Sequence, residues 1–532
     1  MPDPRQHGRT EYYIEGEGFA PPMSMLRPIA SAVPGTAAAD NSETMGAIDP
    51  PTVDPNRAFR FCRLFPDLPP FRPGDEALVA LGKSMVDDRD TPGRDSPIPS
   101  GFTYFGQFVD HDITFDRTVG IPDGALEPEE IVQGRTPSLE LDSLYGRGPL
   151  DSPELYDTDG VHLRLGTTTG RTAFGVTDSF PNDLPRRPPS DPIPAQAIIA
   201  DPRNDEHLIV AQMHVAFIKF HNQVVAHLAA SGTVTNELFD VARKTVVQHY
   251  QSIVWHDFVC RLAAPNVWAE MTTNKRSWFL PSGSPQRKDL CMPIEFSAAA
   301  YRLGHSMIRN RYEWNRVFSS TGRLLPDLAL FFTFSQMSGT LGGEPTLPSD
   351  WIVDWRRMFD FGQQPGSVRH SQLNFARPID THLARDLRNL PQFFGADPQH
   401  LKFLPVRNLL RGRLLGLPTG QDVAAKLAVT PLTSAEVAAG TNAQIITDHG
   451  FDQQTPLWFY VLKEAEVRHA GQHLGEVGSR LVVETFQGLI EGSEHSIFLD
   501  SKWKPTLPSQ DADHFSMNDL LLFINDLNPI GD

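Results

Sequence analysis

The sequence GFTYFGQFVDHDITF, residues 101–115, sets one short polar run in an aromatic, apolar background. Ser100 precedes it and is a residue type that favours the N-cap position, so we predict a helix through this stretch. Asp110 and His111 lie three and four residues after Gln107, so both lie on roughly the same face of that helix as Gln107. Polar groups on an apolar helix need water, a partner or a cavity. A polar stripe that faces water explains the pattern about as well as a buried site does.

A second polar group stands just before a long apolar pattern. The residues DPRNDEH (201–207) lead into the segment 206–230, whose spacing predicts a long, largely buried helix. Arg203 and Glu206 are three residues apart and would share one side of a helical turn. Taken alone, an ion pair at a helix N-terminus is the simpler interpretation of this pair.

A third segment, YRLGHSMIRNRY (301–312), carries one histidine in an apolar helical pattern, which predicts a helix over 294–310. Gly304 removes a side chain next to His305, as a bulky planar ligand would require. Arg302 lies one helical turn earlier. Taken alone, a core histidine with satisfied hydrogen bonds explains the segment more simply.

The segment RNLLRGRLLGLP (407–418) contains Asn408 and Arg411. We interpret it as a basic cluster in an apolar loop, and a basic surface turn is the alternative.

A stretch of alternating polar and apolar residues, TPSLELD, covers residues 136–142. In an extended chain, alternate side chains lie on one side, so Thr136, Ser138, Glu140 and Asp142 would point together. Several oxygen-bearing groups on one side suit a hard cation such as Ca²⁺. An amphipathic strand with its polar face in water is an equally good interpretation.

Composition limits the class of protein and its partners. The chain has 532 residues, 40% of them hydrophobic, and a formal net charge of −18, so we expect a folded protein that binds neither nucleic acid nor an anionic membrane. The three cysteines are too few and too scattered to predict a disulfide framework or a thiolate metal site. We see no signal peptide and no membrane-spanning stretch. The expectation is a soluble protein, cytoplasmic by default or exported by a leaderless route.

The apolar pattern predicts helices throughout and few strands. Besides those above, we expect helices at 75–86, 236–262, 379–390, 421–427, 434–439, 455–468, 475–491 and 515–525. The predicted organisation is a wrapping N-terminal arm, 1–74, followed by one large, mainly α-helical domain, 75–532. The sequence does not indicate an oligomeric state.

These segments, in this order, resemble the peroxidase–cyclooxygenase superfamily, and most closely its bacterial, animal-type haem peroxidases. The resemblance implies a mainly α-helical fold with haem b held between a distal and a proximal helix. It implies an enzyme that reduces hydrogen peroxide and oxidises a small donor such as a halide, thiocyanate or an organic molecule. His305 would bind the haem iron, and Asn408 would accept the other N–H of its ring. His111 would act as distal acid and base, and Arg203 would stabilise developing negative charge.

The same resemblance implies further roles. Gln107 would position water or a small anion beside the distal histidine. Asp110 and Glu206 stand where relatives form ester links to haem. His207 stands where some members carry a methionine that forms an additional link, so that link is expected to be absent.

Charged groups complete the implied site. Arg302 and Arg411 would neutralise haem propionates. Calcium would bind oxygen ligands from two segments, at a site where Glu140 replaces the aspartate that the family more often has. These ligands are Asp112, Thr136, Ser138, Glu140 and Asp142.

Two other functions remain open at this point. A fatty-acid dioxygenase of the same superfamily would use a tyrosine three residues before the proximal histidine. Here that position holds Arg302, and we expect Tyr301, four residues before, to point elsewhere. A non-catalytic binding scaffold would be expected to have lost His111 or Arg203, and the chain has both.

Overall fold

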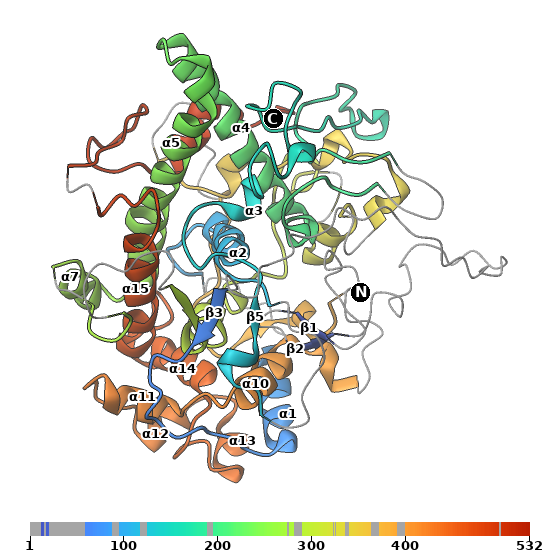
Figure 1. Cartoon of the computed structure of the whole chain (residues 1–532). Coiled ribbons are helices and arrows are strands. Elements are labelled where there is room, and N and C mark those ends of the chain that lie inside the picture. Colours follow the sequence, from blue (N-terminus) through green and yellow to red (C-terminus); the bar gives the residue numbers. More distant parts are fainter. Residues whose placement is uncertain are drawn as a thin grey trace, which may run out of the picture.

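Helices dominate the chain, as its apolar periodicity predicts (Figure 1). The computed structural model describes residues 12–14, 18–20, 59–87, 95–116, 125–188, 195–273, 276–280, 290–322, 324, 326–335, 340–362, 372–390, 399–499 and 502–531. The α-helices are α1 (Asp75–Ser84), α2 (Gly101–Ile113), α3 (Asp142–Tyr145), α4 (Leu208–Ala230), α5 (Leu238–Ser252), α6 (Cys260–Leu262), α7 (Pro265–Thr273), α8 (Ile294–Ser297), α10 (Leu404–Leu414), α11 (Gly420–Lys426), α12 (Ser434–Val437), α13 (Ala443–Asp448), α14 (Leu457–His469), α15 (Glu476–Glu491) and α16 (Met517–Ile524).

The strands are short and belong to three small sheets. They are β1 (Tyr12–Ile14), β2 (Gly18–Ala20), β3 (Phe59–Cys62), β4 (Val86–Asp87), β5 (Val132–Gln133), β6 (Cys291–Pro293) and β7 (Leu383–Ala384). β3 is the middle strand of the one three-stranded sheet in the described part of the chain, antiparallel to β5 and parallel to β6. The fold is therefore mainly α-helical and forms a single large domain.

The predicted helix around the opening polar run is α2, near the centre of the molecule (Figure 1). Its aromatic residues explain its depth, because Phe108 stacks on Phe217 of α4 with ring centroids 4.6 Å apart. Phe105 contacts the same ring and is fully buried. Truncating such a residue to alanine typically costs about 3–5 kcal/mol. The polar side chains of α2 are therefore carried by a helix that aromatic packing fixes in place.

The start of α2 differs from the prediction. Ser100 occupies the N-cap position, but its side chain makes no capping bond and instead contacts the sulfur of Met358. Gly101 explains why the helix begins here, because a Cβ atom at this position would lie 2.4 Å from the ring of Phe359. A close approach of neighbouring chain segments therefore fixes the N-terminus of α2.

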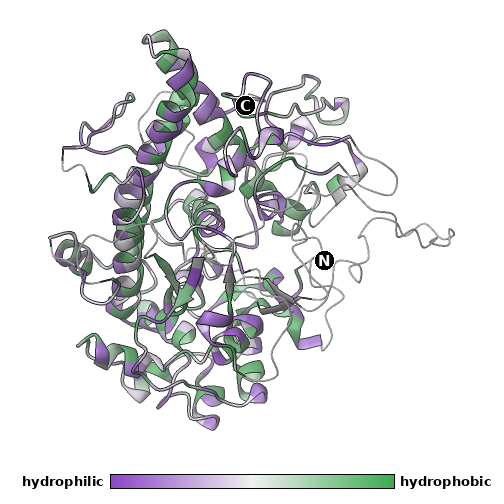
Figure 2. Ribbon diagram, viewed as in Figure 1, coloured by the Kyte–Doolittle hydropathy of each residue, from purple (hydrophilic) through white to green (hydrophobic). Residues whose placement is uncertain are grey.

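The two long apolar patterns, 206–230 and 236–262, form packed helices in the structure. α4 is apolar on nearly all sides and is buried along most of its length, and it packs against α2, α5 and α16. The predicted helix 236–262 is continuous, but it contains a π-helical turn, Ile253–Val259, between α5 and α6. Figure 2 shows hydrophobic and hydrophilic segments alternating along the long helices. No helix in the described ranges is long and apolar enough to cross a membrane.

Two helix predictions and one loop prediction need correction. Residues 294–310 form only the short α8 and a tight 3₁₀ helix, η9 (Ala300–His305). Residues 379–390 contain β7 and a 3₁₀ turn, Arg385–Arg388, in place of an α-helix. The predicted loop over 407–418 is largely α10, whose first turn accommodates a proline because the N–H that proline lacks would have no helical partner there.

The alternating stretch 136–142 is also not an extended strand. It bends repeatedly, with the amide of Ser138 bonded to the carbonyl of Thr136 and the amide of Glu140 bonded to the carbonyl of Ser138. Leu141 has a positive φ of 57° and starts α3. Alternation therefore reflects a folded loop whose apolar and polar residues are all largely buried.

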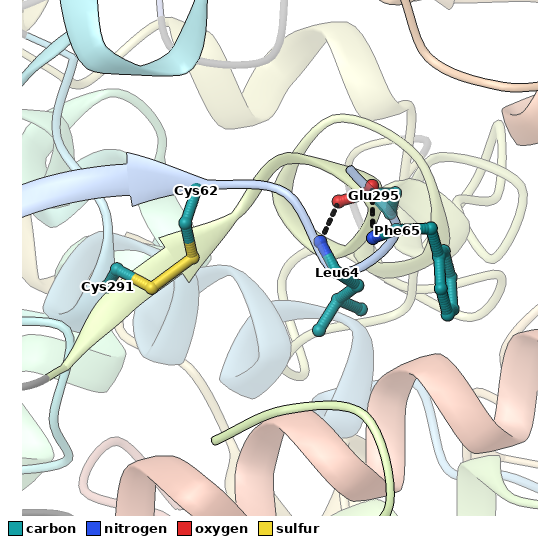
Figure 3. The surroundings of a disulfide bond; sticks show 5 residues. All are labelled: Cys62, Leu64, Phe65, Cys291 and Glu295. Atoms are coloured by element: carbon teal, nitrogen blue, oxygen red, sulfur yellow. Dashed lines mark hydrogen bonds between the residues drawn. A yellow bond between two sulfur atoms is a disulfide. The ribbon is translucent and has the colours of Figure 1, made fainter. Parts of the chain in front are cut away.

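Two cysteines form a bond that the sequence did not predict (Figure 3). Cys62 at the end of β3 and Cys291 at the start of β6 make a disulfide between residues 229 positions apart. Just beyond it, the buried carboxylate of Glu295 accepts the amide N–H groups of Leu64 and Phe65 at 3.0 and 3.3 Å. The apolar segment 59–71 is thus docked on the domain, while most of the predicted arm before it lies outside the described residues.

Candidate active site

A cavity between α2, η5 (Pro202–Asp205), the start of α4 and η9 brings together seven of the nine residues predicted for the haem site. It contains about 1060 Å³ of space not filled by protein atoms, a figure that includes solvent at its mouth. The predicted residues that line it are Gln107, Asp110, His111, Arg203, Glu206, Arg302 and His305.

His111 belongs to a chain of hydrogen bonds that fixes its ring. Its Nδ1 lies 2.8 Å from the side-chain oxygen of Asn204, and the amide nitrogen of Asn204 lies 3.0 Å from Nδ1 of His214. Burial lowers the pKa of His214 to about 3, so His214 is neutral and can accept this N–H. In this arrangement the oxygen of Asn204 faces His111, so Nδ1 of His111 carries the hydrogen. The Nε2 atom of His111 then carries the lone pair of a base.

Arg203 is held rigidly beside this histidine. Its Nε and one terminal nitrogen bind the Asp201 carboxylate at 3.0 and 2.8 Å, and the same terminal nitrogen donates to the carbonyls of His111 and Thr114. Burial alone would raise the pKa of Asp201, but Arg203 and Arg135 outweigh it and hold that pKa well below its usual value. A buried guanidinium thus lies at the cavity wall with its orientation fixed by a carboxylate.

Gln107 makes two contacts with the segment that precedes α4. Nε2 of His207 lies 2.7 Å from the Gln107 side-chain oxygen, and the Gln107 amide nitrogen lies 3.5 Å from Glu206. Burial lowers the pKa of His207 to about 3, which keeps its ring neutral. The side chain of Gln107 therefore has a defined orientation at the cavity.

Asp110 on α2 and Arg302 on η9 lie next to each other at the cavity wall and form an ion pair. Their closest charged atoms are 3.7 Å apart. One oxygen of Asp110 and one terminal nitrogen of Arg302 are buried without a hydrogen-bond partner. Such atoms are costly unless a further group satisfies them, so they mark where a polar part of a ligand would fit.

His305 occupies the opposite end of the polar constellation, on η9. Its Nδ1 lies 2.8 Å from the side-chain amide of Asn408 on α10. Burial, with a smaller contribution from Arg302, lowers the pKa of His305 to about 3, so the ring is neutral as metal ligation requires. A Cβ atom at Gly304 would meet nothing within 4 Å, which agrees with open space beside the histidine. With its amide oxygen turned to this nitrogen, Asn408 would accept the Nδ1 hydrogen and leave Nε2 free for a metal.

Two expectations about this wall change in the structure. Tyr301 was expected to point away from the position of Arg302, yet both line the cavity, because η9 is a tight 3₁₀ helix. The hydroxyl of Tyr301 donates to the carbonyl of Gly106 at 3.0 Å. Arg411, in contrast, lies outside the cavity lining and pairs with Asp116 at 2.8 Å.

The structure places Asp112 against the loop that carries the other predicted calcium ligands, while one oxygen of the Glu140 carboxylate accepts the amide N–H of His495. The two carboxylate oxygens of Asp112 accept N–H groups from Leu141 and Ser143, and burial together with the nearby Asp142 raises the pKa of Asp112 to about 7. The hydroxyl of Ser138 is buried without a hydrogen-bond partner. Oxygen donors of this kind suit Ca²⁺. Within the described ranges, however, no three acidic, histidine or cysteine side chains converge into a preformed metal cage.

Sequence reasoning missed three residues that orient the site. They are Asn204, His214 and Asp201, each buried and in contact with a predicted residue or with its partner. Asn204 lies inside the motif that supplied Arg203, so its position was visible, but only the fold shows that it faces His111. His214 is one of three histidines in the apolar pattern of α4, with His221 and His227, and nothing in the local sequence distinguishes it from the other two.

The family comparison gives a match over most of the chain. A sequence profile described as animal haem peroxidase matches residues 97–489 of the 532. A peroxidase-like protein of Margaritifera margaritifera is 26% identical over 279 residues, which cover 44% of this chain and 34% of the relative. The chorion peroxidase of Drosophila melanogaster is 22% identical over 321 residues, which cover 56% of this chain and 38% of the relative. The chain thus matches only a minority of the length of these curated relatives.

Solved structures share the fold at low identity. Peroxidase A from Dictyostelium discoideum superposes with a TM-score of 0.60 at 14% identity, covering 90% of this chain and 95% of that one. A fatty acid alpha-dioxygenase from Arabidopsis thaliana gives a TM-score of 0.53 at 14% identity, covering 87% and 75%. At such identities the likeness establishes the architecture and leaves the reaction to be argued from the site.

Proposed function

Because the chain belongs to the animal haem peroxidase family, we propose that it reduces hydrogen peroxide to water and oxidises a small donor. The observation that carries this proposal is the meeting of His111, with a fixed base-competent tautomer, and neutral His305 around one cavity. Membership of the family implies a haem cofactor. The space beside Gly304 and the unpartnered polar atoms of Asp110 and Arg302 fit a planar group with polar edges.

We assign the residues that would hold the haem b as follows. His305 would bind the iron through Nε2, and Asn408 would fix the ring of His305. Arg302 would neutralise a propionate with its unpartnered terminal nitrogen. Asp110 and Glu206 are the proposed positions for ester links. The same role for Arg411 stays a prediction, and Arg411 would have to leave its present partner to fulfil it.

The distal residues carry the proton chemistry in this proposal. When bound, the haem iron would supply the electrons that peroxide reduction needs and recover them from the donor. His111 Nε2 would accept a proton from one peroxide oxygen and return it to the other as that oxygen leaves as water. Arg203 would stabilise the negative charge that develops on the leaving oxygen, because its guanidinium is already oriented and buried. Gln107 would hold water or a small anion next to them.

We propose an organic donor ahead of a halide or thiocyanate. Several apolar and aromatic side chains line the cavity beyond the polar residues, and they include Tyr104, Leu328, Phe331 and Phe332. Such a wall favours burial of an apolar molecule. A dioxygenase reaction is less well supported, because Arg302 stands where that reaction would need a tyrosine.

Calcium is proposed at Asp112 together with Thr136, Ser138, Glu140 and Asp142. Burial and, to a smaller extent, the neighbouring Asp142 raise the pKa of Asp112, and a cation there would offset both effects. It would also hold α2 through the residue next to His111. Chelation confirmed by metal analysis should therefore lower both peroxidase turnover and the thermal midpoint of unfolding. If both are unchanged after complete metal removal, the calcium proposal is wrong.

The function is tested by expressing the protein with haem supplied and measuring peroxide-dependent oxidation of phenol, iodide and thiocyanate. We expect a haem absorption band and turnover that requires peroxide, with phenol as the best of these donors. The matched variant His111→Ala should keep the haem band and lose turnover. A folded protein that takes up no haem would contradict the proposal.

A further inference from the structure

His207 stands between α2 and α4, and the proposed reaction gives it no role. Its side chain is buried, with 5% of its surface exposed, and it lines the cavity. Its Nδ1 accepts the amide N–H of Val210 at 3.4 Å and so caps α4, while its Nε2 lies 2.7 Å from the oxygen of Gln107. One imidazole therefore joins the start of α4 to the cavity face of α2.

The hydrogen bond from the Val210 amide determines which atom of Gln107 faces His207. The Val210 amide can only donate, so Nδ1 of a neutral His207 ring must carry the lone pair, and Nε2 must carry the hydrogen. The atom of Gln107 that faces Nε2 is then an acceptor, which is the amide oxygen. The amide nitrogen of Gln107 points the other way, toward Glu206 at 3.5 Å. The orientation of Gln107 therefore follows from the capping hydrogen bond that His207 accepts from Val210, three residues further along the chain.

Aromatic neighbours keep the imidazole in this plane. Tyr104 packs edge-on against it with ring centroids 5.2 Å apart, and Phe332 packs edge-on at 5.7 Å. Phe331 lies nearly parallel to it at 6.5 Å. A ring enclosed on these sides cannot turn to exchange its two nitrogens without displacing its neighbours.

We propose that His207 is a positioning residue that fixes the amide of Gln107 with its N–H donors toward Glu206 and the cavity. This inference rests on the proposed peroxidase function, because Gln107 matters only if a ligand binds beside His111. Its consequence concerns ligand chemistry: at this point the cavity offers donors, and so it favours an anion or a peroxide oxygen over a group that needs an acceptor. The residue thus acts through Gln107 and need not touch the substrate.

Fluoride is a suitable probe, because it binds ferric haem and accepts hydrogen bonds from its surroundings. The variant His207→Asn keeps a good N-cap residue but is too short to reach Gln107. Losing the orienting bond should weaken fluoride binding to the ferric holoprotein by about three- to tenfold, the usual worth of one hydrogen bond. The longer His207→Gln can again donate to Gln107 and should restore part of the affinity.

A double-mutant cycle separates this role from capping. In a Gln107→Leu background, His207→Asn should leave fluoride affinity unchanged, because the group that His207 orients is gone. If His207→Asn weakens fluoride binding equally in both backgrounds, or in neither, the positioning role is refuted.

A protein that takes up no haem would refute the proposed function separately. The inference would then be decided by ring ¹⁵N chemical shifts of His207 in histidine-labelled protein. Hydrogen on Nε2 supports it, and hydrogen on Nδ1 overturns it.

Discussion

Two of the histidines that line the cavity, His111 and His305, are supported in different ways. His111 sits on a long α-helix, and its ring is oriented through Asn204 by a second buried histidine, His214. His305 sits on a tight 3₁₀ helix, and its ring makes a side-chain hydrogen bond with Asn408. Each histidine has a buried arginine nearby, Arg203 beside His111 and Arg302 on the same 3₁₀ helix as His305.

This difference matches the work that each residue would do. A base that gives and takes a proton must keep one tautomer, so its partners must have a defined hydrogen-bond direction. An iron ligand needs a neutral ring in the correct orientation, which burial and one amide provide. Distal changes should therefore affect reaction rate with haem retained, and proximal changes should affect haem binding first.

Loss of the proximal ligand should have the largest effect. His305→Ala removes the only side chain assigned to the iron, so we expect haem to be lost when the purified protein passes through gel filtration. The ratio of haem absorbance to protein absorbance measures this. Normal haem content and full turnover in this variant would show that His305 is not the ligand.

The distal counterpart should separate rate from binding. His111→Ala should retain haem, while the rate constant for reaction with peroxide falls by about 10²–10⁴-fold, the usual contribution of general acid–base catalysis. Stopped-flow absorbance at the haem band gives this rate. A decrease below tenfold would mean that another group moves the proton.

Variants of Asn204 and Asn408 form a matched pair, and we expect their effects to be smaller than those of the histidine variants. Asn204→Leu should slow the peroxide reaction by about 10–100-fold and leave haem affinity nearly unchanged, and Asn408→Leu should do the reverse, because each orients one histidine. Haem transfer to an acceptor protein and stopped-flow rates measure the two effects. The comparison fails if both variants change the same quantity.

The smallest expected effect is on the free energy of unfolding at acid pH, and it comes from His214, which helps to orient His111. Burial lowers the pKa of His214 to about 3, below its usual value of 6.5, so the unfolded chain binds a proton more readily than the fold does. The stability due to this group is complete above pH 6.5 and is lost as pH falls toward 3, by about 1.4 kcal/mol per pH unit. His214→Leu should flatten the decline in urea-unfolding free energy between pH 7 and 5.

The exposed His449→Gln is the control for this measurement and should leave the pH dependence unchanged. An equal slope in wild type and His214→Leu would show that His214 is not the group that resists protonation.

The sequence predicted those helices whose aromatic and apolar residues repeat at helical spacing. α2 and α4 were visible because their packing faces repeat at helical spacing, and these helices position Gln107, Asp110 and His111. The motif order also identified the family, which the profile match confirms.

Contacts between distant segments were not visible in the same way. Asn204 and His111 lie 93 positions apart, and Cys62 and Cys291 lie 229 apart, so neither pairing leaves a local trace. The 3₁₀ character of η9 was missed because its apolar spacing over a few residues resembles an α-helix. The loop 136–142 was missed because alternation suits a bent, buried loop as well as a strand.

The central claim is that haem lies in this cavity with His305 as its iron ligand and His111 on the other side. A crystal structure of the haem-reconstituted protein tests it most directly. The account predicts iron bonded to Nε2 of His305, Nδ1 of that ring bonded to the Asn408 oxygen, and His111 facing the iron without binding it. Haem bound outside the cavity, or iron ligated by any residue other than His305, would contradict it.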